Sequence, residues 1–171
     1  GNSGLAGLFV LDRTSGRVVA RILTPGPVQA SPVAVEGGGW IVVDSFGTVL
    51  RLDADLEPVW KEPHNLGKAA LRSPVLAGEL VVISTAGDAV VALGLADGAW
   101  QWTFKHDVAR GSQDLAILGA PAPILLGDEL VAGFSDGSIA GIDAVTGVER
   151  WSAQVGSGRF PDIQAEVVAT D

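Results

Sequence analysis

The sequence predicts an all-β protein built from similar units of four short antiparallel strands. A phrase made of an apolar strand, an Asp, a turn with Gly and a closing strand recurs along the chain. Its closing positions, Ala20, Trp60, Trp102 and Trp151, lie 40, 42 and 49 residues apart. The apolar segments between them are strand-sized and show no helical periodicity. A period of about forty residues with four strands per unit is typical of a β-propeller, whose blades surround a central channel.

Proline and glycine mark the first two strands of each unit. The first strand follows a Ser-Pro or Ala-Pro pair, because a proline at the start of a strand breaks no ladder hydrogen bond. A hairpin that contains Gly leads to the second strand. The first strands are predicted at residues 31–35, 73–76 and 122–126, and the second strands at residues 40–44, 80–84 and 130–134.

The third strand is apolar and the fourth carries the tryptophan. The third strands are predicted at residues 48–53, 89–95 and 138–143. The first three strands of each unit are almost continuously apolar, which is typical of a sheet covered on both faces, as a blade between two neighbours is. The fourth strand mixes charges with its Trp, as in residues 57–61 and 148–151, so we expect it at an exposed outer edge.

The two ends of the chain predict incomplete blades. Residues 8–12 and 17–23 match a third and a fourth strand, and residues 163–169 match a first strand. We therefore expect one partial propeller domain over residues 1–171, with about four blades forming an arc of a larger ring. Its uncovered edges would favour association with partner chains. The repeats are expected at about residues 1–24, 30–62, 72–105 and 120–155, with the start of the next at 159–171.

Composition excludes several classes of function. The chain is 47% hydrophobic with 23 Gly and only 18% charged residues, so it is not of the disordered class. A net charge of −9 and scattered basic residues argue against nucleic-acid binding. The absence of Cys excludes disulfides, thiolate metal sites and cysteine nucleophiles within these residues. No apolar run is long enough for a transmembrane helix, and the lack of Met leads us to expect a piece of a longer protein.

The polar residues favour structural roles over catalysis. His64 and His106 each follow a predicted fourth strand, so we expect both in solvent-exposed loops at one rim of the propeller. Asp107 could orient His106 as a base, but no nucleophile stands at a defined spacing. Asp53 and Asp55 resemble half of a calcium loop, yet the Gly and the Glu at position twelve are missing. We interpret Asp53 as a turn residue that accepts backbone hydrogen bonds.

The repeated phrase also resembles that of a known family. Residues 142–151, Ile-Asp-Ala-Val-Thr-Gly-Val-Glu-Arg-Trp, resemble the repeat of the PQQ-like β-propellers, Asp-x-x-Thr-Gly-x-x-x-Trp, and matching phrases cover nearly the whole chain. Two eight-bladed groups share this repeat, the quinoprotein alcohol dehydrogenases and the BamB-type outer-membrane assembly lipoproteins. The resemblance implies that Trp60, Trp102 and Trp151 lock adjacent blades by packing. Ala20 and Gly94 depart from the pattern.

The absence of Cys favours the second group. The quinoprotein dehydrogenases hold their quinone against a disulfide of neighbouring cysteines and bind calcium with Glu, Asn and Asp. The chain has no Cys and no recognisable set of those ligands, so we predict no cofactor, metal or catalytic residue. Residues 159–165 instead resemble the BamB-type segment Arg-Leu-x-Asp-Val-Asp, with Arg159 and Asp162 matching and Gln164 replacing the second Asp. Leu118 stands where another docking loop of that family, near residues 105–119, carries Arg.

The resemblance implies a protein-interaction scaffold that is not an enzyme. It implies contacts of Arg159, Asp162, Gln164 and Leu118 with a protein partner, namely the periplasmic domains of the outer-membrane insertase. It also implies a periplasmic location in the bacterial envelope, in an outer-membrane-anchored parent. The alternative is a fragment of a PQQ-dependent dehydrogenase-like or ligand-sensing propeller with its site in other blades. Self-association through exposed blade edges is a further expectation.

Overall fold

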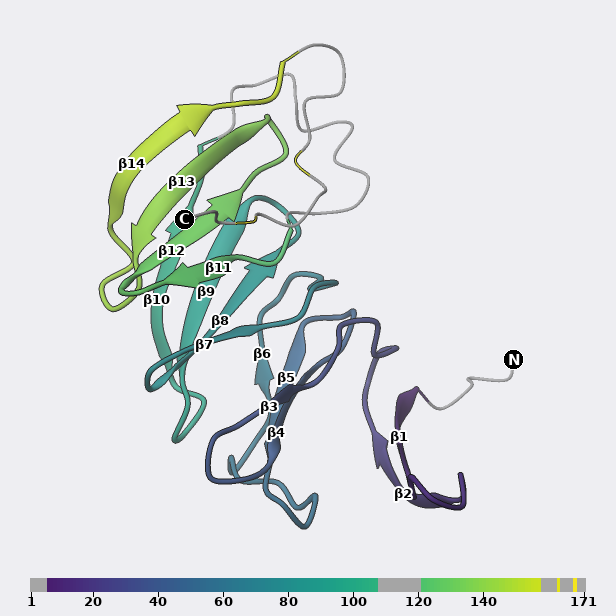
Figure 1. The fold of residues 1–171 in the computed structure, drawn as a ribbon. Helices are drawn as coiled ribbons and strands as arrows, with labels where there is room; N and C mark the ends of the chain where they lie inside the picture. The colour runs from purple at the N-terminus through teal and green to yellow at the C-terminus, as the bar shows by residue number, and fades with distance from the viewer. Residues whose placement is uncertain (1–5, 108–120, 158–162, 164–167, 169–171) are drawn as a thin grey trace.

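The computed structural model describes residues 6–107, 121–157, 163 and 168, and the elements in those ranges are all strands (Figure 1). They form one two-stranded and three four-stranded sheets, each antiparallel, and within each sheet the strands pair in chain order. The predicted all-β architecture of successive four-stranded units is therefore confirmed. Figure 1 shows the sheets following one another along an arc, with β1 and β2 at one end and β14 at the other.

We call the four sheets blades 1 to 4. Blade 1 contains β1 (Gly7–Leu11) and β2 (Val18–Leu23). Blade 2 contains β3 (Val33–Ala34), β4 (Trp40–Val43), β5 (Thr48–Leu52) and β6 (His64–Asn65). Blade 3 contains β7 (Val75–Ala77), β8 (Leu80–Thr85), β9 (Ala89–Gly94) and β10 (Trp100–Lys105). Blade 4 contains β11 (Ile124–Leu126), β12 (Glu129–Gly133), β13 (Ser138–Asp143) and β14 (Glu149–Gln154).

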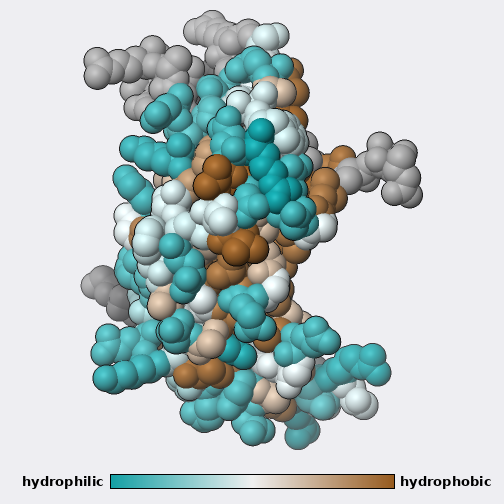
Figure 2. Space-filling view, turned by 90° about the vertical axis from the view of Figure 1, so that its left-hand side faces the viewer, coloured by the Kyte–Doolittle hydropathy of each residue, from teal (hydrophilic) through white to brown (hydrophobic). Residues whose placement is uncertain are grey.

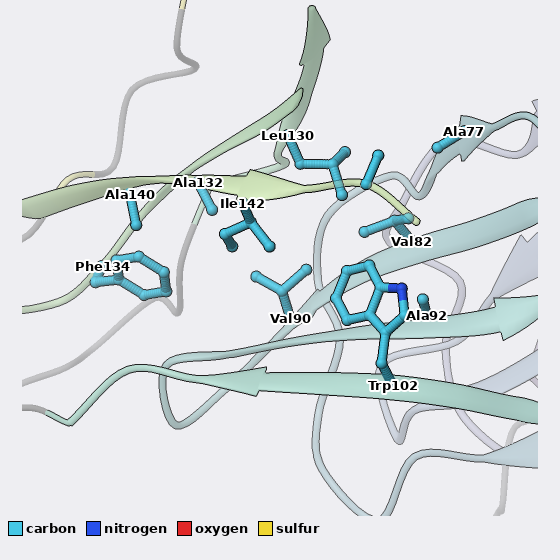
Figure 3. Packing of buried hydrophobic residues seen from close by; sticks show 11 residues of the cluster. Ala77, Val82, Val90, Ala92, Trp102, Leu130, Ala132, Phe134, Ala140 and Ile142 are labelled. Carbon is cyan, nitrogen blue, oxygen red and sulfur yellow. The ribbon is translucent and has the colours of Figure 1, made fainter. Parts of the chain in front are cut away.

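Blade 3 shows why the middle strands are apolar on both faces. Successive side chains of a strand point to opposite faces of the sheet. On β8, Val81 and Ile83 are buried against blade 2, whereas Val82 is buried against blade 4. Figure 3 shows the cluster of buried residues between blades 3 and 4, in which Trp102 lies beside Val82 and Ala92 of its own blade. The core is therefore a series of layers between blades.

The outer strands are more exposed than the middle ones, as predicted. Every residue of β14 is exposed, while β12 and β13 are largely buried. Figure 2 shows the side of the molecule that lies at the left of Figure 1, with separate apolar patches set among polar side chains. The first strands lie closer to one another, since β7 and β11 of neighbouring blades are in contact.

The fourth strand of blade 2 differs from the prediction. The expected strand around Trp60 is reduced to an isolated bridge between Leu52 and Pro58, and regular pairing with β5 resumes only at β6. Pro58 and Pro63 supply no backbone N–H, which prevents a continuous ladder there. His64 therefore lies in β6. The prediction that it lies in a loop after the fourth strand is wrong. The predicted strand at residues 163–169 lies outside the described residues, apart from residues 163 and 168.

The propeller has two rims with different connections. One carries the links between blades together with the turns between second and third strands, and we call it the crossover rim. Backbone hydrogen bonds join the two kinds of segment there, from Ala86 N–H to the Ala69 carbonyl at 2.8 Å and from His106 N–H to the Asp88 carbonyl at 2.9 Å. The opposite rim, which we call the hairpin rim, carries the other two turns of each blade.

Candidate interaction site at the crossover rim

A tryptophan is buried in each interface between the four-stranded blades. Trp60 of blade 2 lies on Gly98 of blade 3, and Trp102 of blade 3 lies on Gly147 of blade 4. A Cβ added at these glycines would stand 2.7 Å and 2.5 Å from the respective indole. Trp60 also donates its Nε1–H to the Leu95 carbonyl at 3.0 Å. Both glycines have a φ of 71°, which favours Gly, so the turn and the indole of the preceding blade fit as a pair.

The Asp of the repeated phrase closes the turn that holds this glycine. Asp143 Oδ1 accepts hydrogen bonds from the backbone N–H and the hydroxyl of Thr146, both at 2.8 Å. Asp12 Oδ1 accepts the same pair from Ser15, both at 2.7 Å. Asp53 accepts two backbone N–H groups of its own turn, in agreement with its predicted role. The repeated phrase therefore forms a turn whose glycine can lie against the Trp of the preceding blade.

The interface between blades 1 and 2 departs from this pattern at both positions. Ala20 of β2 replaces the Trp, and Leu56 takes the left-handed position of the turn with a φ of 70°. The Leu56 side chain lines an apolar cavity of about 270 Å³ together with Leu8 and Val10 of β1. Leu56 therefore lines an open apolar space between blades 1 and 2, where the repeat has lost its indole.

Trp151 occupies the third equivalent position, on the face of blade 4 that points away from blade 3. Its indole lies against Gly141 of its own blade and donates Nε1–H to Glu129 Oε1 at 3.1 Å. It is 38% exposed, compared with 4% for Trp60 and 7% for Trp102. The hairpin rim beside it holds an ion-pair cluster in which Arg150 keeps the pKa of Asp143 well below its ordinary value by direct hydrogen bonding.

A polar groove opens at the crossover rim where blades 3 and 4 meet. Its volume is about 250 Å³. It is lined by His106, Asp107, Asp136, Ser138, Ser152, Ala153 and Gln154. The groove therefore joins the end of β10 to the turn between β12 and β13 and to the outer strand β14.

His106 is the centre of this groove and differs from its predicted state. Its Nε2 lies 2.9 Å from Asp136 Oδ2 and 2.8 Å from Ser138 Oγ, and its ring stacks on Phe134 with 4.4 Å between centroids. The side chain is half-buried, and its partner is Asp136 of the next blade and not the adjacent Asp107. The prediction that His106 is exposed to solvent is therefore wrong, because the turn of blade 4 packs over it.

The polar trio is arranged for cohesion. Ser138 donates its hydroxyl to Asp136 Oδ1 at 2.6 Å. Burial acts to raise the pKa of Asp136, but the hydrogen bonds from Ser138 and His106 outweigh it and hold that pKa below its ordinary value. A hydrolytic triad needs Asp and Ser on opposite nitrogens of the imidazole, whereas here both approach Nε2. The contacts join two blades and do not activate the serine.

Asp88 adds a second link between the same blades, which sequence reasoning missed. It is 6% exposed and accepts hydrogen bonds from the Ser135 backbone N–H at 2.8 Å and the Ser135 hydroxyl at 2.6 Å. Asp44 of blade 2 is fully buried and accepts the Gly26 N–H at 2.8 Å. An Asp in each turn between second and third strands was the available signal. Its position differs from turn to turn, so the repeat did not reveal it.

The predicted partner-binding residues Leu118, Arg159, Asp162 and Gln164 lie outside the described residues. The described chain ends before residue 108 and again before residue 158. Asp107 lines the groove, and Gln154, in the outer strand before the second break, donates Nε2–H to the carbonyls of Asp136 and Gly156. Both segments therefore leave the described structure at the crossover rim beside the groove.

Within the described ranges, no three or more His, Cys, Asp or Glu side chains are grouped so that they could hold a metal ion. In the same part of the chain, no helix is long and apolar enough to cross a membrane.

The comparison with protein families decides the relationship. The model of the family "Outer membrane protein assembly factor BamB" matches residues 7–170, almost the whole chain. The chain belongs to this BamB family. Its repeat is accordingly of the PQQ-like type, as the Asp-x-x-Thr-Gly-x-x-x-Trp phrase indicated. Among curated protein sequences, none matches the chain.

Solved structures of the same fold include other propellers. BamB from Moraxella catarrhalis has a TM-score of 0.71 at 20% identity, covering 85% of this chain and 43% of that one. The computationally designed Ika8 protein has a TM-score of 0.72 at 13% identity, covering 95% of this chain and 46% of that one. A europium-containing methanol dehydrogenase has a TM-score of 0.68 at 20% identity, covering 82% and 27%. The chain thus spans less than half the length of these structures, and the likenesses show the fold.

Proposed function

We propose that this chain is part of a non-catalytic propeller scaffold that binds a protein partner during outer-membrane assembly in the bacterial envelope. The observation that carries the proposal is the BamB family match over residues 7–170. That family is described as an outer membrane protein assembly factor, and loops on a rigid scaffold are common binding sites. The periplasm is the compartment that such a role requires.

The proposed contact surface is the crossover rim at blade 4. Arg159, Asp162, Gln164 and Leu118 are its proposed partner-binding residues, and the segments that hold them leave the described structure beside the His106 groove. The inter-blade bonds of His106 to Asp136 give this rim a rigid base. A rigid base lowers the ordering cost of binding, which supports an interface at this place.

The residues present do not fit a quinone cofactor. The chain contains no Cys, so these residues cannot form the disulfide against which a quinone would stack. The buried carboxylates of Asp44 and Asp88 are engaged by backbone N–H groups and by the Ser135 hydroxyl, which leaves little of their coordination capacity for calcium. The dehydrogenase-like alternative therefore rests on fold likeness alone.

A binding measurement tests the proposal. The chain is immobilised and exposed to the purified periplasmic domains of an outer-membrane insertase, and affinity is measured by interferometry. We expect Asp162→Arg to weaken binding by about tenfold or more, because reversing a charge at a complementary interface replaces attraction with like-charge repulsion. Asp55→Arg makes the same change at an exposed carboxylate of the hairpin rim and serves as the matched control.

The folded state of each variant is checked by far-UV circular dichroism. Equal weakening by Asp162→Arg and Asp55→Arg would place the contact elsewhere or make it a non-specific charge effect. An absence of binding by the folded, unmutated chain would remove this surface as the docking site.

A further inference from the structure

A second polar groove lies at the hairpin rim, where blades 2 and 3 meet. Its volume is about 390 Å³. Blades 2 and 3 both have four strands, and each has a neighbouring blade on either side within the chain, so further blades of a longer propeller would join the arc elsewhere. We call this space the hairpin-rim groove. It is lined by Val35, Glu36, Leu76, Gly78, Glu79 and Leu95.

The hairpin-rim groove combines apolar walls with two carboxylates. Val35 is buried in the layer between blades 2 and 3, and Leu76 and Leu95 pack against the same layer. Glu36 of blade 2 and Glu79 of blade 3 are exposed, and among the described residues neither belongs to an ion pair. Apolar walls with a charged end suit a long side chain that buries its stem and ends in a cation.

Arg51 does not neutralise these carboxylates. It extends from β5 of blade 2 and donates Nη1–H to the Leu95 carbonyl at 2.5 Å, beside the bond that Trp60 makes to the same oxygen. It does not line the groove, and it forms no ion pair with another described residue. The two Glu side chains therefore keep a charge of −2 without a counter-charge in this part of the structure.

Blade 4 shows how the repeat neutralises an equivalent carboxylate. Asp128 holds the place in the hairpin between β11 and β12 that Glu79 holds between β7 and β8, each directly after a left-handed Gly. The main chain confirms the equivalence. The Glu79 carbonyl accepts the Leu95 N–H at 2.8 Å, and the Asp128 carbonyl accepts the Ala144 N–H at 3.0 Å.

The two blades differ in the cation that accompanies this carboxylate. Arg150 donates Nη1–H and Nη2–H to the two oxygens of Asp128, at 3.0 Å and 2.7 Å. Gln101 stands directly before the Trp of blade 3, as Arg150 does in blade 4, and its amide donates to the Ala99 carbonyl at 3.4 Å. Blade 3 thus keeps the carboxylate at Glu79 but lacks the guanidinium that binds it in blade 4.

We propose that the hairpin-rim groove binds an arginine side chain from an extended segment of a partner protein. The methylene stem would lie against Leu76 and Leu95, and the guanidinium would pair with Glu36 and Glu79. Arginine is favoured over lysine because its planar fork binds a carboxylate through two hydrogen bonds, as Arg150 binds Asp128. The groove lies at the rim opposite the partner-binding residues proposed above, so the two proposals are independent.

An NMR titration of the isotope-labelled chain tests this. The probe is the peptide acetyl-Ala-Arg-Ala-amide, at concentrations up to about 20 mM because exposed ion pairs are weak. The amide signal of Gly78 should shift and saturate. The amide of Gly127 in the equivalent hairpin should stay in place, because Asp128 there is already bound by Arg150. A peptide with citrulline in place of Arg has nearly the same shape without the charge and should not shift Gly78.

Two variants and a control locate the contact. Glu79→Gln and Glu36→Gln should each weaken binding by about threefold to tenfold, because each removes one partner of a charge-assisted hydrogen bond. Glu57→Gln makes the same change at an exposed Glu of the hairpin rim that does not line the groove, and it should bind like the unmutated chain. The dispersion of the amide spectrum shows that each variant is folded.

Three results would overturn the proposal. The first is the absence of a saturable shift at Gly78 with the arginine peptide. The second is an equal response to the citrulline peptide, which would make the contact independent of charge. The third is unchanged affinity in both Glu79→Gln and Glu36→Gln.

Discussion

Replacing Trp102 with Ala should destabilise the chain more than replacing any exposed Trp. Trp102 is 7% exposed and packs in the layer between blades 3 and 4, against Val82, Leu130 and Ile142. Truncation of a buried aromatic side chain costs about 3–5 kcal/mol through lost burial and the cavity left behind. Its Nε1 has no hydrogen-bond partner among the described residues, so this cost contains no lost hydrogen bond.

Trp100→Ala is the matched control for this prediction. Trp100 lies in the same strand but is 59% exposed, and its indole donates a hydrogen bond to Thr103 Oγ1. Its loss should cost about 1 kcal/mol or less. For a chain of this length, about 3–5 kcal/mol corresponds to a fall in Tm of roughly 6–20 °C.

Urea unfolding followed by far-UV circular dichroism measures both variants. The free energy of unfolding should fall for Trp102→Ala with little change in the m value, since the surface exposed on unfolding is nearly the same. If Trp102→Ala loses no more stability than Trp100→Ala, the indole does not bind blades 3 and 4 together and the reasoning is refuted.

Three further predictions concern the other inter-blade contacts. In the double variant Ala20→Trp with Leu56→Gly, the free energy of unfolding from thermal denaturation should exceed the value expected from adding the effects of the two single changes by about 1 kcal/mol or more. Additive effects would contradict this. Asp88→Asn should cost about 1–3 kcal/mol in urea unfolding, because a buried acceptor of two hydrogen bonds is altered; an unchanged midpoint would argue against the link. The lowered pKa of Asp136 means that its stabilising contribution is complete above the unfolded pKa and is lost as pH falls below about 4. Asp136→Asn should therefore flatten the acid limb of the stability profile, and an unaltered limb would show that Asp136 does not contribute to it.

The blades could be predicted from the sequence because each depends on short, local patterns. A turn that must hold a left-handed residue selects Gly, as at Gly98 and Gly147, and the Trp that covers it must follow at a fixed spacing in its own blade. Repetition of these requirements makes them visible as a period. Where the contact is altered, as at Leu56 and Ala20, the period weakens in the sequence as well.

Contacts across blades could not be predicted in the same way. The bond between His106 and Asp136 joins residues thirty positions apart and depends on how one turn lies over the end of another strand. The outer strand of blade 2 is interrupted at Pro58. The Trp pattern predicted a strand there and did not show the effect of this proline on strand pairing. The proposed roles of Leu118 and Asp162 depend on the family resemblance alone, because loop residues follow no periodicity that would identify them.

A double-mutant cycle between Trp102 and Gly147 tests the central claim, that an indole on a turn glycine joins successive blades. Gly147→Ala should cost more than Gly127→Ala, because both strain a left-handed residue but only at Gly147 would the added Cβ stand 2.5 Å from an indole. In the Trp102→Ala background, the cost of Gly147→Ala should fall to that of Gly127→Ala, giving a coupling of about 1 kcal/mol or more. Additivity within about 0.5 kcal/mol would contradict the claim.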